Sequence, residues 1–137
     1  GPEHPDTLTS LNNLAATLSA QGEHGAARAL EEQGLDARRR VLGPEHPDTL
    51  TSLNNLACTL ATQGEGAKAQ ALWEAAVAGA RRVLGPAHPH TRTFEQHLLV
   101  CLFRQSEQDS AKFTQIIEFF PDPEWLSQLL AEVGGED

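Results

Sequence analysis

Polar side-chain pairs recur in this chain at a fixed spacing of 42 residues: Asn12–Asn13, Asn54–Asn55 and Gln96–His97. An amide side chain both donates and accepts hydrogen bonds, so a row of amides on one surface can hold the backbone of an extended peptide. The alternative interpretation is that one asparagine of each pair ties neighbouring structural units together. Both interpretations require the pairs to lie in register along one face.

The histidines and cysteines indicate neither a catalytic site nor a metal site. His4, His46 and His88 recur with the same period, each directly before a proline, which is typical of a linker element rather than of a metal ligand. Cys58 and Cys101 are one residue out of register with the repeat and are interpreted as small buried or groove-wall residues. The acidic residues form no close pair on one helical face, and no phosphate loop or nucleophile elbow is present. We therefore expect no enzyme activity, no metal and no cofactor.

An internal repeat must position these side chains. The text GPEHPDTLTSLNNLA opens at Gly1 and recurs unchanged at Gly43, and a third copy opens at Gly85 as GPAHPHTRT before it diverges. Periods of about 20–50 residues are typical of stacked units that complete one another's core. The chain begins in phase with the repeat and contains no Met, so we expect it to be a piece of a longer protein. The predicted organisation is a repeat over 1–42, a second over 43–84, a degenerate third over 85–120, and a capping helix and tail over 121–137.

Each period is predicted to form two helices. A proline followed by an acidic residue, as at Pro5 and Asp6, favours a helix start, because proline lacks the N–H that a first turn leaves unpaired and Asp complements the helix dipole. Gly22 is expected to end the first helix, and Gly43 can adopt the left-handed conformation that closes the second. Apolar residues at helical spacing are expected to face the core. They are Leu8, Leu11, Leu14, Ala15, Leu18, Ala26, Ala27, Leu30, Leu35 and Val41 in the first repeat, and Ala69, Leu72, Trp73, Ala76, Val77 and Val83 in the second.

The third repeat departs from this pattern. Arg92 and Glu95 replace leucines of the first helix, and Ser106 replaces the turn glycine, so we expect different stacking there. The second helix of this repeat is expected to stop before Pro121, and a further helix over 123–133 is expected to follow it. We interpret that helix as a cap over the apolar end of the array. The alternative is that it occupies the groove as a bound partner peptide would.

The pattern within each period resembles the tetratricopeptide repeat. The first helix carries Leu-x-x-Leu-Ala, a glycine marks the turn, and an alanine follows five residues after that glycine. The 42-residue period, with LNNLA, a QG turn and RRVLGPEHPDT between units, is similar to the kinesin light chain type. The resemblance implies an all-α, right-handed α-solenoid whose first helices line a concave groove. It also implies a protein–protein interaction scaffold that binds a partner peptide or helix in that groove.

The same resemblance implies a set of groove residues: Thr9, Asn12, Asn13, Thr51, Asn54, Asn55, Cys58, Gln96, His97 and Arg104. In the kinesin light chain family, asparagines at the LNNLA position contact cargo peptides, which implies that role for Asn12 and Asn54. Basic groove residues that serve acidic cargo in that family are largely missing, since Arg104 is the only cation expected there. The asparagine ladder that grips a terminal carboxylate in other members is also missing, because Ala16 and its counterparts Cys58 and Val100 occupy its position.

Charge and composition bound the partners. The net charge of −9 disfavours a nucleic-acid or anionic-membrane surface, because both need clustered cations. No run approaches the ~20 apolar residues of a membrane span, and two cysteines without a disulfide framework indicate a reducing, cytoplasmic setting. The first repeat has no predicted cap, so we expect either a polar edge or a homodimer through the N-terminal repeat. Self-association, or a sensor array in a larger bacterial signalling protein, is therefore the alternative function.

Overall fold

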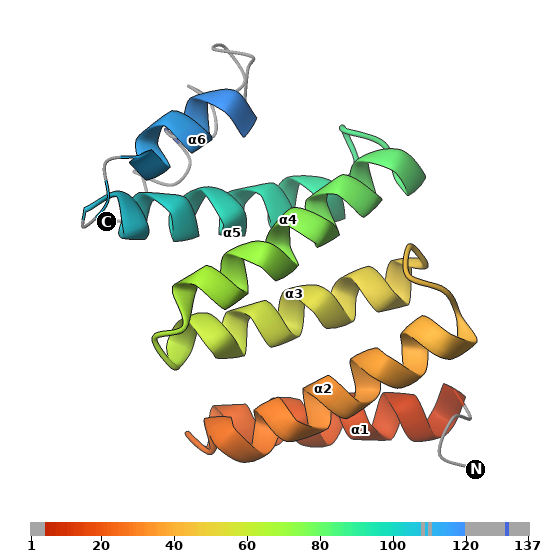
Figure 1. Ribbon diagram of the computed structural model, residues 1–137. Helices are drawn as coiled ribbons and strands as arrows, with labels where there is room; N and C mark the ends of the chain where they lie inside the picture. Colours follow the sequence, from red (N-terminus) through yellow and green to blue (C-terminus); the bar gives the residue numbers. More distant parts are fainter. Residues whose placement is uncertain (1–4, 108, 110, 120–130, 132–137) are drawn as a thin grey trace.

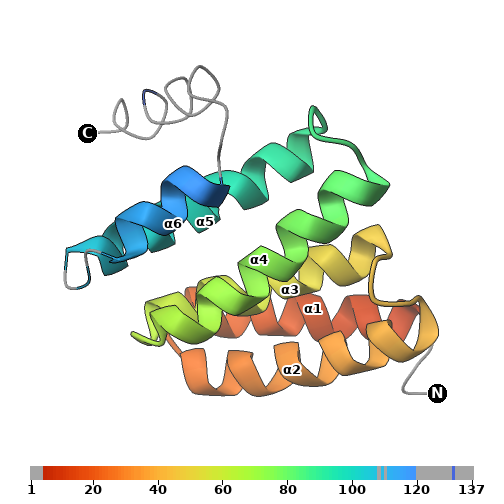
Figure 2. The same ribbon diagram turned by 45° about the horizontal axis from the view of Figure 1, so that its top comes forward.

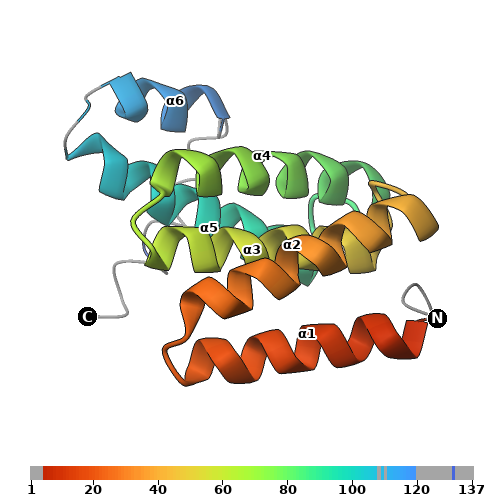
Figure 3. The ribbon, with the colours of Figure 1, turned by 60° about the horizontal axis from the view of Figure 1, so that its bottom comes forward.

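The computed structural model describes residues 5–107, 109, 111–119 and 131, except for the side chains of Pro5, Phe113, Ile117 and Phe119. Within that part the chain forms six helices: α1 (Pro5–Ala20), α2 (His24–Val41), α3 (Pro47–Thr62), α4 (Gly66–Val83), α5 (Pro89–Ser106) and α6 (Ala111–Phe119). The helices stack in chain order as three helix hairpins, and α2 also packs on α3 as α4 does on α5 (Figure 1). One layer contains α1, α3 and α5, and the other contains α2, α4 and α6 (Figure 3). The predicted all-α solenoid is confirmed, whereas the predicted cap over 123–133 lies, apart from Ala131, outside the described residues.

The repeated linker caps the first helix of each repeat through its histidine. Nδ1 of His46 accepts a hydrogen bond from the N–H of Asp48 at 3.1 Å, and Nδ1 of His88 accepts one from the N–H of His90 at 3.0 Å. Such an acceptor satisfies one of the backbone donors that the first helical turn leaves unpaired. His46 and His88 are therefore helix caps, in agreement with their interpretation as linker elements, while His4 lies outside the described residues.

Glycine ends the first helix in two repeats, and its replacement lengthens that helix in the third. Gly22 and Gly64 have φ angles of 81° and 83°, in the left-handed region that favours glycine, and α1 and α3 each span 16 residues. Ser106, at the matching position, is still helical, and α5 spans 18 residues. A side chain with a Cβ thus continues the helix where glycine would turn the chain.

The core is centred on α3 and α4, which have helices on both sides. Leu50, Leu99 and Val77 are among its largest fully buried side chains, and Trp73 is buried with them. α6 packs on α5 (Figure 2). Leu98 and Leu102 of α5 extend the same cluster toward α6. The buried cluster therefore runs continuously from Leu35 of α2 to Ile116 of α6 rather than forming a separate core in each repeat.

Four residues that were expected in the core are exposed instead. The exposed fractions are 50% for Leu14, 45% for Val41 and 47% for Val83, and Ala26 is also exposed. Leu14 is the clearest case, because its counterpart Leu56 lies in the same LTSLNNLA sequence and is only 5% exposed. Leu56 lies on α3 between Ser52 and Thr59, which both form hydrogen bonds with side chains of α2, so α2 packs over this side of α3; no helix of the described chain packs on the matching side of α1. The valines lie in the last turns of α2 and α4, beside the linker, and Ala26 lies in the first turn of α2, where the next residue takes the buried position.

Stacking in the third repeat uses an ion pair where the second repeat uses leucine. Glu95 is 3% exposed and pairs with Arg81 at 2.9 Å, whereas its counterpart Leu53 is an apolar core residue. Between α2 and α3, Arg38 donates instead to the hydroxyl of Ser52 at 3.0 Å and to a backbone carbonyl of α1 at 3.0 Å. The different stacking expected for the third repeat is therefore confirmed.

A glutamine joins α4, α5 and α6. Nε2 of Gln70 donates to Glu74 at 2.6 Å and to Gln115 at 3.0 Å, and its Oε1 accepts from Gln105 at 3.1 Å and from Lys112 at 3.0 Å. This buried amide thus satisfies its full hydrogen-bonding capacity and helps to fix α6 on the array.

Candidate functional site

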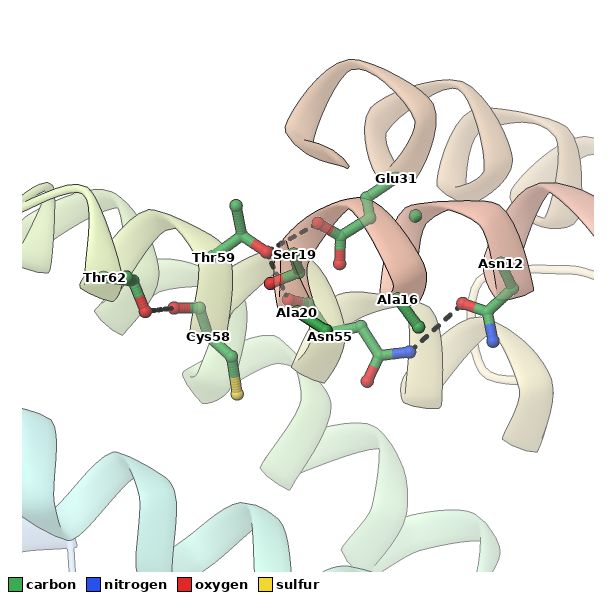
Figure 4. A pocket seen from close by; sticks show the side chains of 10 residues that line it. Asn12, Ala16, Ser19, Ala20, Glu31, Asn55, Cys58, Thr59 and Thr62 are labelled. Carbon is green, nitrogen blue, oxygen red and sulfur yellow. Dashed lines mark hydrogen bonds between the residues drawn. The ribbon is translucent and has the colours of Figure 1, made fainter. Parts of the chain in front are cut away.

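Two hollows lie along the surface formed by α1, α3 and α5, which we call the first-helix face. The N-terminal hollow, between α1 and α3, has a volume of about 340 Å³, and its lining includes Asn12, Ala16, Glu31, Asn55, Cys58 and Thr59 (Figure 4). The C-terminal hollow, between α3 and α5, has a volume of about 500 Å³, and its lining includes Trp73, His97, Val100, Cys101, Arg104 and Gln105. Cys58 and Thr62 line both hollows, so the two adjoin.

Asparagines of the repeated pairs bridge neighbouring repeats. Nδ2 of Asn55 donates to Oδ1 of Asn12 at 3.2 Å, and the equivalent contact one repeat later joins Nδ1 of His97 to Oδ1 of Asn54 at 2.8 Å. The indole N–H of Trp73 donates to the same oxygen of Asn54 at 2.9 Å. Because that oxygen accepts from the indole, His97 contributes its Nδ1–H. The oxygens of Asn12 and Asn54 therefore bridge neighbouring repeats, as the alternative interpretation of the asparagine pairs expects.

At the N-terminal hollow, each of the two bridging amides keeps one polar atom that is free to bind a ligand. Within the described residues, Nδ2 of Asn12 and Oδ1 of Asn55 have no protein hydrogen-bond partner, and both side chains lie at the hollow (Figure 4). One free donor and one free acceptor side by side match the needs of a peptide unit. The bridging contact and a binding contact are thus compatible in the same two side chains.

The structure places the predicted groove residues in three groups. Asn12 and Asn55 line the N-terminal hollow, His97 and Arg104 line the C-terminal hollow, and Cys58 lines both. Asn54 lines neither but bonds to two lining residues of the C-terminal hollow. The remaining four also line neither hollow: Thr9 and Asn13 are exposed on α1, Thr51 donates to a carbonyl of its own helix, and Gln96 is half-buried on α5.

The N-terminal hollow is anionic. Burial raises the pKa of the Glu31 carboxyl group, and the hydroxyl of Thr59, which donates to it at 2.6 Å, partly opposes that shift. Burial also raises the pKa of the Cys58 thiol, and the charge of Glu31 raises it further. The thiol is therefore held in its neutral form and acts here as a wall of the hollow rather than as a nucleophile.

The C-terminal hollow is mostly apolar, with a polar rim. Trp73, Val100 and Cys101 provide apolar surface, and Arg104 is the only cation among the lining residues. Burial lowers the pKa of His97, so its neutral form is favoured at neutral pH. This hollow is suited to an apolar side chain with a polar or acidic group beside it.

Sequence reasoning did not place Glu31 and Trp73 in the candidate site. They occupy the same repeat position on the second helices α2 and α4, and each reaches the first-helix face from there. Trp73 was predicted as a core residue and is buried, but it also forms a wall of the C-terminal hollow. The sequence did contain a signal for this position, because Glu in one repeat is replaced by Trp in the next while the repeats are otherwise similar.

In the described part of the chain, no three His, Cys, Asp or Glu side chains gather in a way that could hold a metal ion. None of the helices seen there is long and apolar enough to cross a membrane.

Stacked two-helix repeats with a line of hollows on one layer define a helical-repeat solenoid. The family model for the tetratricopeptide repeat matches residues 7–48 and 49–90. The chain belongs to the tetratricopeptide repeat family. This family generally mediates protein–protein interaction and is generally non-enzymatic.

Solved structures of kinesin light chain-like proteins have the same fold. The chain is 27% identical to a putative kinesin light chain with nearly identical TPR-like repeats from Podosopora anserina, with a TM-score of 0.73 over 88% of this chain and 58% of that one. It is 18% identical to BtubC (BKLC) from P. vanneervenii, with a TM-score of 0.72 over 96% of this chain and 56% of that one. The chain thus spans somewhat more than half the length of each, and the expected kinesin light chain-like repeat type is confirmed. A comparison with curated proteins finds no significant match.

Proposed function

We propose that the chain binds an extended segment of a protein partner along the first-helix face, with the two hollows as adjacent side-chain subsites. The observation that supports this proposal is that Cys58 and Thr62 line both hollows, so one peptide can occupy both. Their volumes of about 340 and 500 Å³ fall within the range of ligand-binding clefts. The free donor of Asn12 and the free acceptor of Asn55 supply contacts for the peptide backbone.

The C-terminal hollow provides the apolar anchor of this site. Trp73 is a residue type that often dominates binding energies, and its indole is fixed by the hydrogen bond to Asn54. An apolar side chain of the partner that enters this hollow removes Val100 and the small exposed part of the indole, since Trp73 is 5% exposed, from water. Preorganisation of the indole reduces the entropy lost on binding.

The test blocks the N-terminal hollow without changing the core. Ala16 is exposed at this hollow, so Ala16→Phe fills the space where the peptide would lie. Ala29→Phe is the matched control, because Ala29 is exposed on α2 and lines neither hollow. Peptides are selected from a random displayed library against the unmodified chain, and their affinities are measured by fluorescence anisotropy.

The expected result is a loss of at least about tenfold in affinity for Ala16→Phe, which corresponds to about 1.4 kcal/mol, and little change for Ala29→Phe. Selected peptides that bind both variants as tightly as the unmodified chain would show that they bind elsewhere. Failure of the library to yield any peptide that competes for this face would also count against the proposal.

Self-association through α1 is a second candidate function. Leu14 is 50% exposed and Leu11 and Leu18 are half-buried, whereas their three counterparts on α3 are buried. An apolar strip of this kind on a helix with one free side favours a partner helix, and a second copy of α1 offers the same strip.

Sedimentation over a range of concentrations tests this candidate. A dimer that Leu14→Glu dissociates is the expected result, since the charge would enter the interface. A strict monomer at the highest concentration reached would remove it.

A further inference from the structure

The N-terminal hollow contains a carboxylate that the protein itself does not neutralise. Glu31 is half-buried, and the hydroxyl of Thr59 is the one hydrogen-bond donor to it among the described residues. No lysine or arginine of that part of the chain forms an ion pair with it. A partly buried carboxylate costs free energy unless a cation or further donors compensate for the lost hydration.

The nearest basic side chains are engaged elsewhere. On α2, Arg28 pairs with Glu32 at 3.0 Å and also with Glu65. Arg38 lines a small neighbouring cavity together with Glu31, but its guanidinium donates to Ser52 and to a carbonyl of α1. His24 is the remaining neighbour whose charge would favour the ionised form of Glu31. From the other helices, the lining of the hollow contributes one titratable group, the neutral thiol of α3, and no cation.

The repeat provides an internal comparison for this position. Glu31 corresponds to Trp73 in the second repeat and to Gln115 in the third, so the fold does not require a carboxylate there. Trp73 makes its hollow apolar, whereas Glu31 makes the matching hollow anionic. The free Oδ1 of Asn55 adds a second acceptor beside the carboxylate.

We infer that the N-terminal hollow binds a lysine or arginine side chain of the partner segment, whose charged group donates to Glu31 and to Oδ1 of Asn55, which can accept from this group and from the peptide backbone together. This inference rests on the proposed function, because the peptide in the groove carries that side chain. A hydrogen bond between charged groups in a partly buried site changes affinity by about tenfold to a hundredfold. The partner segment therefore combines a basic residue for the N-terminal hollow with an apolar residue for the C-terminal hollow.

Selection from a random peptide library tests the specificity. The library is selected in parallel against the unmodified chain, Glu31→Gln and the control Glu32→Gln, which removes the same charge from the same helix outside the hollow. Enrichment of Lys or Arg at one peptide position is expected for the unmodified chain and the control, and its loss is expected for Glu31→Gln. Replacing that basic residue by norleucine should weaken binding to the unmodified chain at least about tenfold. Selected peptides without basic enrichment, or enrichment that persists with Glu31→Gln, would overturn the inference.

A titration followed by NMR tests the hollow independently of any selected peptide. The probes are Nα-acetyl-lysine methylamide and Nα-acetyl-norleucine methylamide, which differ in the ammonium group. The lysine probe alone is expected to shift the side-chain amide signals of Asn12 and Asn55, and Glu31→Gln should abolish these shifts. Equal shifts from both probes, or none, would refute a cation site.

The two experiments separate the two proposals. A lysine-specific shift without any groove-binding peptide supports the cation site and counts against the proposed function. Groove-binding peptides without a basic residue support the proposed function and refute the cation site.

Discussion

Replacement of Leu56 by alanine is expected to lower the free energy of unfolding by about 2.5–5 kcal/mol, and the same replacement at Leu14 by only about 1 kcal/mol. The two leucines lie at the same point of the same local sequence, LTSLNNLA, on α3 and α1. Helix propensity and nearest neighbours along the chain are therefore identical, and the difference between the variants isolates the effect of tertiary packing.

The magnitude follows from the exposed fractions. Leu→Ala removes three carbon groups worth about 0.8 kcal/mol each when buried, or about 2.4 kcal/mol at Leu56, which is 5% exposed. The cavity left between α2 and α3 adds to this cost. Leu14 is 50% exposed, so about half of the transfer free energy is at stake, and no closed cavity forms.

Urea unfolding followed by far-ultraviolet circular dichroism measures both variants. Measurements at several protein concentrations serve as the control, because self-association through α1 would make the effect of Leu14→Ala concentration-dependent. Equal costs at the two positions, with equal slopes against urea, would refute the assignment of α2 as the element that buries Leu56.

Three further predictions concern polar groups. Thr49→Val should raise the free energy of unfolding by about 1 kcal/mol in urea titrations, because the buried hydroxyl of Thr49 has no hydrogen-bond partner among the described residues. Thr59→Val should lower the free energy of unfolding, because it removes the hydrogen bond to the carboxylate of Glu31. Changes of the same sign in the two variants would contradict this explanation. Arg81→Ala should lower the free energy of unfolding by about 2–3 kcal/mol, because it leaves the carboxylate of Glu95 buried and unpaired. Adding Glu95→Leu should recover most of that loss, as measured by thermal unfolding. A double variant no more stable than Arg81→Ala would show that the ion pair does not hold α5 on α4. Burial lowers the pKa of His97 below its ordinary 6.5, so the stability that neutral His97 contributes is present above pH 6.5 and is lost as the pH falls through the lowered pKa. NMR titration should show the lowered pKa, and His97→Asn should flatten the pH dependence of the free energy of unfolding. An unchanged pH dependence in this variant would show that it does not come from His97.

The helices and turns of the repeat could be predicted because their signals are local. Proline at the helix start and glycine at the turn act through their own backbone preferences, and Ser106 changed the turn for the same reason. The burial of a side chain could not be predicted from such local signals. Leu14 and Leu56 have identical sequence surroundings, and only the neighbouring helix decides which one enters the core.

On the first helices, half of the predicted groove residues line the two hollows, whereas the lining residues on the second helices were not predicted. The asparagine pairs were found by their period, but their bridging contacts join residues 43 apart, which links one position of the pair to the other position in the next repeat. Trp73 was missed because it was assigned to the core, and Glu31 was missed because only the first helices were expected to line the groove. The difference in chemistry between the hollows arises from this second-helix position and from α5, which supplies His97, Val100 and Arg104 to the C-terminal hollow in place of the LNNLA helix.

Glu31 is expected to have opposite effects on stability and on binding, which would distinguish it from a structural residue. Burial raises the pKa of Glu31 in the folded chain above 4.5, so the folded state favours the protonated form. The stability that the protonated carboxyl group contributes is therefore present below about pH 4.5 and is lost as the pH rises through the raised pKa. At neutral pH the ionised carboxylate therefore opposes folding, while glutamine keeps an oxygen that can accept from Thr59. Glu31→Gln should accordingly be at least as stable as the unmodified chain and yet lose the basic partner residue. A residue that only tied α2 to α3 would lose stability and binding together.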